Sequence, residues 1–234
     1  MKRFVLSVVL AAECLVAAAP AAPPPVKPGR PRCAVERVVI ISVDGLRPDC
    51  LLLASASVMR RLIMEGAYTL WARTTANATT LPSHASMLTG VAPERHGIDG
   101  TRDLSLLQPA FPAAPTVMEL AAAADYTTAM VAGKASFTIF NRPGTITFVS
   151  RPEAKTAADA GVAALSHGRD DARSRHIPWV IDGPGVKRGY DLSRVPNLQV
   201  NTEDSAATAC WLLGLAPTEK LDGRAVTAAF AAAD

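Results

Sequence analysis

The chain has 234 residues, of which 49% are hydrophobic and 19% are charged, so it can bury the core of one globular domain. This composition excludes extensive disorder. The formal net charge of +3 is small and the basic residues are scattered along the chain, so we expect no nucleic-acid binding.

Residues 1–22 are predicted to be a signal peptide. A basic start is followed by an apolar stretch and by small residues at positions 17–22, which is the pattern of a cleavable secretory signal. An uncleaved membrane anchor is the alternative, but Glu13 interrupts the apolar run and leaves it short for a bilayer. We therefore expect a periplasmic or secreted protein with no stable membrane anchor. A proline-rich linker over residues 23–36 would precede the domain, residues 37–234.

The domain opens with a strand prediction. Residues 38–43, VVIISV, form a nearly continuous apolar run rich in β-branched side chains, which is typical of a strand buried on both faces of a parallel sheet. Asp44 follows at the carboxyl end of this strand, where the crevices of open α/β sheets form. The pair Asp44-Gly45 is also a common turn, so a purely structural role for Asp44 stays open.

Helix-like and strand-like segments alternate further along the chain. Helical periodicity and start signals predict helices at residues 55–65, 116–124, 156–165 and 204–215. Short apolar runs predict strands at residues 127–131 and 177–181. This order predicts an α/β domain.

The stretch TTANATTLPSHASMLTG, residues 74–90, places several hydroxyl side chains where a helix is predicted to begin. Thr80 is followed by Leu81-Pro82, and because proline suits the first helical turn, Thr80 is placed at or near the N-cap. A hydroxyl there faces backbone N–H groups and the positive end of the helix dipole, which suit a phosphate. A cap and a nucleophile look alike in sequence. Coordination to a divalent cation would distinguish the nucleophile, and Asp44 is a suitable ligand.

Four stretches together resemble the type I phosphodiesterase and nucleotide pyrophosphatase family of the alkaline phosphatase superfamily. They are VDG at Asp44, TTLPSHASMLTGVAPERHGI over residues 79–98, PTVMELAAAADYTTAMVAGK ending at Lys134, and IPWVIDGPGVKRG over residues 177–189. They occur in the order found in the family. The resemblance implies a mostly parallel sheet with helices on both faces, two zinc ions, and a metal-bound threonine that attacks phosphorus.

Carried over by position, the resemblance assigns roles to five residues. Asp44 would bind one zinc, Thr80 would be both its ligand and the nucleophile, and His167 would bind the second zinc. Lys134 and Thr101 are assigned to substrate binding, and Thr101 stands where the family has an asparagine that donates to a phosphoryl oxygen. The structural alternatives are a turn for Asp44, a cap for Thr80 and a solvated loop for His167.

His84 and His96 are expected to support the loop and not to bind metal, as in the family pattern.

The chain also departs from the family pattern near residues 165 and 166. An Asp-x-x-x-His ligand pair and a later Asp-His-Gly are missing, and with them four metal ligands and one or two strands. Three later residues are substitutes by chemical type but lack the spacing of the missing pair: Asp170, Asp171 and His176.

Two main functional hypotheses follow from the resemblance to the family and from the segment missing near residues 165 and 166. The first is an exported, metal-dependent phosphohydrolase that acts on a small phosphate ester or nucleotide through Thr80. The alternative is a catalytically impaired remnant of the same family that binds phosphate or a single metal. A different branch of the superfamily, such as a phosphoethanolamine transferase or a phosphomutase-like enzyme, is a third reading.

Overall fold

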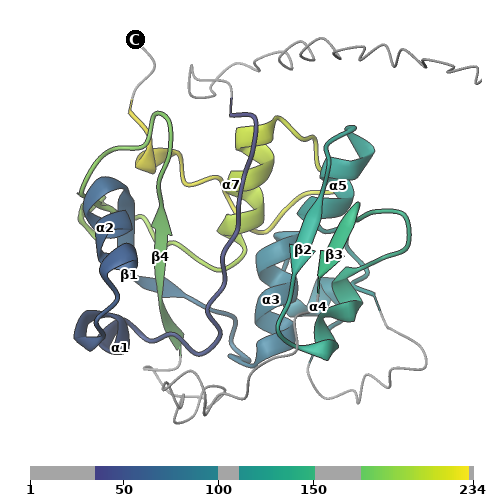
Figure 1. Ribbon diagram of the computed structural model, residues 1–234, viewed down its shortest axis with the longest axis horizontal. Coiled ribbons are helices and arrows are strands. Elements are labelled where there is room, and N and C mark those ends of the chain that lie inside the picture. Colours follow the sequence, from purple (N-terminus) through teal and green to yellow (C-terminus); the bar gives the residue numbers. More distant parts are fainter. Residues whose placement is uncertain (1–34, 100–110, 151–174, 232–234) are drawn as a thin grey trace, which may run out of the picture.

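The computed structural model describes residues 35–99, 111–150 and 175–231 and shows a mixed α/β chain with a small sheet and several helices (Figure 1). The predicted α/β class is confirmed, and the architecture is consistent with a truncated alkaline-phosphatase-like fold. The elements in chain order are α1 (Pro48–Leu53), α2 (Ser57–Glu65), β1 (Ala67–Arg73), α3 (Thr80–Thr89), α4 (Pro93–His96), α5 (Val117–Ala123), β2 (Ala129–Val131), η1 (Ala135–Phe140), β3 (Phe148–Ser150), β4 (His176–Ile181), β5 (Tyr190–Asp191), η2 (Leu192–Arg194), α7 (Asp204–Leu213) and η3 (Thr227–Ala229).

The larger sheet has the strand order β4-β1-β5. β1 pairs antiparallel with β4, from Ala67 opposite Ile181 to Arg73 opposite His176, and parallel with β5. Gly66 precedes β1, and a Cβ atom there would collide with the carbonyl oxygen of Ile181, so only glycine allows these backbones to approach so closely. β2 and β3 form a separate parallel pair. The predicted strands at residues 127–131 and 177–181 are therefore confirmed, whereas β1 was not predicted.

Three predicted helices are confirmed as α2, α5 and α7. α5 begins with a capping box, in which Glu119 N donates to Thr116 Oγ1 at 3.2 Å and Thr116 N donates to Glu119 Oε2 at 2.7 Å. The helix predicted at residues 156–165 lies outside the described residues.

α7 lies in the middle of the molecule, between β4 on one side and the β2–β3 pair on the other (Figure 1). Ala206, Ala209 and Leu213 of this helix are buried together with Val117 and Leu120 of α5. On its other side Leu212 belongs to a second cluster that includes buried alanines of β1. The helix therefore joins the two halves of the core.

Residues 38–43 are extended but belong to no sheet, so the prediction of a strand buried on both faces is wrong. Val38 and Ile40 pack against the core clusters of α7, whereas Val39 and Ile41 are 79% and 78% exposed. The side chains alternate as in a strand, with one face on the core and the other open. The physical reason is that none of the described strands lies beside this segment to complete a hydrogen-bonded ladder.

Helices capable of spanning a membrane are lacking in the described part of the chain. The predicted signal peptide lies outside that part. Cys50 is exposed and Cys210 is buried, and both are free thiols. Burial raises the pKa of the Cys210 thiol to about 11, so this group is protonated and unreactive at neutral pH.

Candidate active site

Asp44 lies directly after the extended segment, in a turn closed by a 3.1 Å hydrogen bond from Leu46 N to Val43 O. Gly45 occupies the left-handed region of this turn at φ 74°, which a residue with a side chain rarely adopts. The turn directs the Asp44 carboxylate toward the start of α3. There Thr80 Oγ1 donates a hydrogen bond of 3.0 Å to Asp44 Oδ2. The structure therefore brings together the predicted nucleophile and its predicted acidic partner.

The hydroxyl of Thr80 is not a helix cap. The N-cap of α3 is Thr79, and no side chain caps this helix. Thr79 Oγ1 is buried and has no hydrogen-bond partner among the described residues. Thr80 is the first helical residue, and its hydroxyl points to Asp44 and not back to the α3 backbone. The structural alternative of a cap at Thr80 is therefore wrong, which leaves its hydroxyl directed at a carboxylate.

Ser83, the other hydroxyl near the start of α3, has a structural position. Its Oγ lies 3.0 Å from Thr74 Oγ1 and 3.0 Å from Thr75 Oγ1. These bonds hold the loop that follows β1 against the first turn of α3. Because Thr75 is only 5% exposed, Ser83 faces the loop interior.

His84 connects α3 to the extended segment. Its Nδ1 lies 2.7 Å from the carbonyl oxygen of Thr80, so Nδ1 is assigned as the protonated nitrogen, and Nε2 then accepts from Ser42 Oγ at 2.8 Å. The ring packs against Phe137 with a centroid distance of 4.8 Å. His84 thus has the supporting role expected of it. Its contact with Ser42 was not predicted from the sequence, although the alternation of Val38, Ile40 and Ser42 on one face of the extended segment could have indicated it.

His96 is also structural. It is 1% exposed, its Nδ1 accepts from Ile98 N at 3.0 Å, and its Nε2 therefore donates to Ser86 Oγ at 3.0 Å. Burial is the main cause that lowers the pKa of this imidazole, so it is neutral where it lies.

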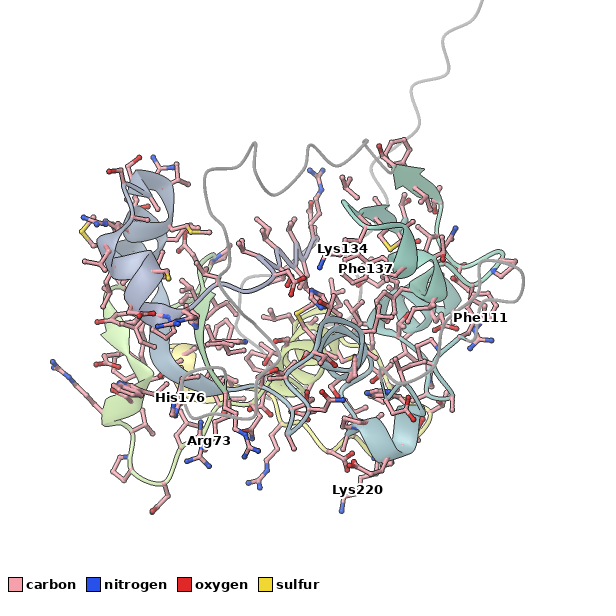
Figure 2. All side chains as sticks on the ribbon, turned by 90° about the horizontal axis from the view of Figure 1, so that it is seen from below. Arg73, Phe111, Lys134, Phe137, His176 and Lys220 are labelled. Atoms are coloured by element: carbon pink, nitrogen blue, oxygen red, sulfur yellow. The ribbon has the colours of Figure 1, made fainter. Side chains whose placement is uncertain are left out.

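Lys134 completes the cluster from the segment before η1. Its ammonium forms an ion pair with Asp44 Oδ2 and lies 3.4 Å from Thr80 Oγ1. The side chains of Lys134 and Asp44 are 46% and 25% exposed, so a dissolved anion can reach them. Figure 2 shows Lys134 beside Phe137, close to the start of η1. The arrangement combines a hydroxyl, a carboxylate that accepts its proton, and a cation suited to a phosphoryl oxygen.

The donors at this position do not fit a zinc site by themselves. Asp44 and Thr80 offer two oxygen ligands, whereas zinc sites usually have at least three protein ligands. Within residues 35–99, 111–150 and 175–231, no group of three or more His, Cys, Asp or Glu side chains is placed to hold a metal. The Lys134 ammonium already contacts both oxygens that would bind a cation.

The remaining predicted ligands are not brought to this cluster by the described residues. His176 lies on β4, edge-on to Trp71 with a centroid distance of 5.3 Å. Figure 2 shows it near Arg73 and away from Lys134. Four other candidates fall outside the described residues: Thr101, His167, Asp170 and Asp171.

Comparison with known proteins concerns the part of the chain that contains Asp44 and Thr80. Residues 38–115 match the family described as type I phosphodiesterase / nucleotide pyrophosphatase, a range that includes Asp44 and Thr80 and ends before Lys134. No curated protein matches the chain closely enough to count as a relative. The matched range agrees with the VDG and TTLPSHASMLTG motifs. Residues 38–115 of the chain therefore resemble the type I phosphodiesterase / nucleotide pyrophosphatase family of the alkaline phosphatase superfamily.

Proposed function

We propose that this protein hydrolyses a small phosphate ester or nucleotide, with Thr80 as the nucleophile. The observation that carries the proposal is the 3.0 Å hydrogen bond from Thr80 Oγ1 to Asp44 Oδ2, with the Lys134 ammonium against both groups. The match of residues 38–115 to the family supports a phosphodiesterase or pyrophosphatase type of hydrolase. Hydrolysis of a phosphomonoester would use the same arrangement.

The proposed chemistry has two steps. Thr80 Oγ forms a bond to phosphorus while the bond from phosphorus to the leaving oxygen breaks, and the Thr80 proton passes to Asp44 Oδ2. The leaving oxygen takes a proton from water. Water then attacks the phosphorus on Thr80 and breaks its bond to Thr80 Oγ, which releases a phosphomonoester from a diester substrate or phosphate from a monoester, and Asp44 returns the proton to Thr80 Oγ. Lys134 binds a phosphoryl oxygen throughout, and the positive end of the α3 dipole at Thr80 favours the same anion.

Turnover through these residues alone should be slow. General base assistance raises the rate of a reaction about 10²- to 10⁴-fold. It is least effective when the base is far less basic than the alkoxide that forms, as a carboxylate is compared with a threonine alkoxide. The proposal includes metal dependence and export, as the resemblance and the N-terminal sequence imply. Metal ions would need ligands beyond Asp44 and Thr80, and His167 is the candidate that the resemblance names. We assign no step to a metal, because the described donors do not complete a site.

The alternative function is phosphate binding by an impaired member of the family. The incomplete donor set favours it, since an anion site needs only Lys134 and the α3 N-terminus, whereas efficient hydrolysis needs an activated nucleophile. The two functions differ in one observable: only the enzyme forms a bond between Thr80 and phosphorus.

The test is release of p-nitrophenolate from bis-p-nitrophenyl phosphate, with and without added zinc. We expect slow turnover that is lost in Thr80→Ala and kept in Ser83→Ala, because Ser83 is held by the loop and does not face Asp44. Retention of the wild-type rate by Thr80→Ala, with loss in Ser83→Ala, would show that the nucleophile is misplaced. Export is tested separately by the mass of the mature N-terminus, which should lie after residue 19 or 22.

A further inference from the structure

A serine and a histidine beside the Thr80 cluster form a second pair with the geometry of a nucleophile and its base. Ser42 is an exposed residue of the extended segment, and its Oγ lies 2.8 Å from His84 Nε2. His84 Nδ1 in turn lies 2.7 Å from the carbonyl oxygen of Thr80. A hydroxyl bonded to an imidazole that a third group orients is the arrangement that activates serine in hydrolases.

The surroundings of His84 fix the direction of both hydrogen bonds. A carbonyl oxygen only accepts, so Nδ1 carries the ring hydrogen and Nε2 of the neutral ring accepts from the Ser42 hydroxyl. Phe137 packs against the ring with a centroid distance of 4.8 Å. When Nε2 takes up a proton, Nδ1 keeps its bond to the Thr80 carbonyl. The ring can therefore accept the serine proton without turning.

Another hydroxyl–imidazole pair, Ser86 and His96, shows what a purely structural pair looks like in this molecule. Its members are 0% and 1% exposed. Because His96 Nδ1 accepts from Ile98 N, its Nε2 donates to Ser86 Oγ, so this imidazole cannot take the serine proton. The bond between Ser42 and His84 runs in the opposite direction and lies at the surface, as catalysis requires.

The space beside Ser42 suits an acyl group. Ser42 and His84 both line a groove of about 810 Å³. Val43, the residue after Ser42, and Met87, one helical turn after His84, line the same groove and make its wall apolar there. Within the described residues, the N–H of Val43 donates to no backbone carbonyl. The N–H that follows a nucleophilic serine is a common donor to the oxyanion of acyl transfer.

We propose that Ser42 and His84 hydrolyse carboxylic esters with an uncharged, apolar acyl group. Ser42 Oγ forms a bond to the carbonyl carbon as its proton passes to His84 Nε2. The bond from that carbon to the alcohol oxygen then breaks, and this oxygen takes the proton from Nε2. Water adds to the acyl carbon and gives a proton to Nε2, the bond to Ser42 Oγ breaks, and Oγ recovers the proton as the carboxylic acid leaves. This activity is separate from attack of Thr80 on phosphorus.

Hydrolysis of p-nitrophenyl butyrate by the full-length protein tests the proposal. Release of p-nitrophenolate is followed by absorbance, and acid-quenched samples are digested for tandem mass spectrometry. We expect a butyryl ester on Ser42. Ser42→Ala should lower the rate above buffer at least about 100-fold, because the activated hydroxyl is lost. Ser193→Ala is the matched control and should keep the wild-type rate, because Ser193 is an exposed serine bonded to Asp191 and does not line the groove.

His84→Gln separates base catalysis from support of the loop. Glutamine can still form hydrogen bonds but cannot take the serine proton, so the rate should again fall at least about 100-fold and the butyryl ester should be absent. Circular dichroism shows whether this variant folds; if it does not, Ser42→Ala and the position of the adduct decide. Wild-type protein no faster than buffer, Ser42→Ala at the wild-type rate, or a butyryl group on Cys50 in place of Ser42 would overturn the proposal. None of these results would alter the test for a phosphoryl adduct on Thr80.

Discussion

Lys134→Met tests the anion-binding role of the cluster. The substitution keeps the length and apolar stem of the side chain but removes the ammonium that contacts Asp44 Oδ2 and lies 3.4 Å from Thr80 Oγ1. We expect weaker binding of inorganic phosphate with little change in the stability of the fold.

The magnitudes follow from the exposure of the ion pair. With 46% of the Lys134 side chain and 25% of the Asp44 side chain exposed, the pair is screened by water and contributes about 0–1 kcal/mol to the free energy of unfolding. A hydrogen bond from an ammonium to a bound phosphate contributes about 1.5–3 kcal/mol. Its loss should raise the phosphate dissociation constant roughly 10- to 150-fold.

Isothermal titration with inorganic phosphate measures this change, and urea denaturation measures the stability. Lys220→Met is the matched control, because Lys220 is exposed and lies far from Lys134 in Figure 2. Lys134→Arg should keep most of the affinity by keeping the charge. Equal phosphate affinity in Lys134→Met and Lys220→Met would refute the assignment of Lys134 to the anion site.

Three further predictions concern other groups. Asp44→Asn removes a negative charge beside the anion site. Without added zinc it should therefore tighten phosphate binding about fivefold or more, while it lowers the rate of hydrolysis. Weaker phosphate binding by this variant in a titration would instead favour a metal ion that bridges Asp44 and phosphate. Thr116→Ala removes the capping box of α5 and should lower the free energy of unfolding by about 1 kcal/mol, which the midpoint of urea denaturation checks against an unchanged slope. Burial lowers the pKa of His96 in the folded state below the ordinary 6.5, so only the unfolded state takes up this proton as the pH falls below 6.5. Stability should therefore be fullest above that pH and decline below it, and the decline should be smaller in His96→Gln.

The helices and the position of the candidate site could be predicted because their signals are local. Thr116 and Glu119 lie within four residues of each other and predict the start of α5, and the Leu81-Pro82 pair predicts the start of α3. The motifs around Asp44 and Thr80 predicted a shared site, and the structure places these side chains 3.0 Å apart although they are 36 residues apart in sequence.

Strand pairing could not be predicted in the same way, because it depends on partners far along the chain. β1 pairs with β4 more than a hundred residues later, and its irregular register between Thr69 and Ala72 obscures any simple alternation. Residues 38–43 have the composition of a buried strand, but a strand in the middle of a sheet needs neighbours on both edges, and sequence composition does not say whether they are present. The contact between Lys134 and Asp44 likewise joins separate segments, so the resemblance gave Lys134 only a general role in substrate binding.

Attack of Thr80 on phosphorus is tested by the mass of the peptide that contains Thr80 after reaction. The full-length protein is incubated with bis-p-nitrophenyl phosphate, quenched in acid and digested, and the modified residue is located by tandem mass spectrometry. If Thr80 is the nucleophile, a p-nitrophenyl phosphoryl adduct forms on Thr80 that is absent from Thr80→Ala and present in Ser83→Ala. An adduct on Ser83, or release of p-nitrophenolate at the wild-type rate with no adduct on Thr80 at any time, would contradict it.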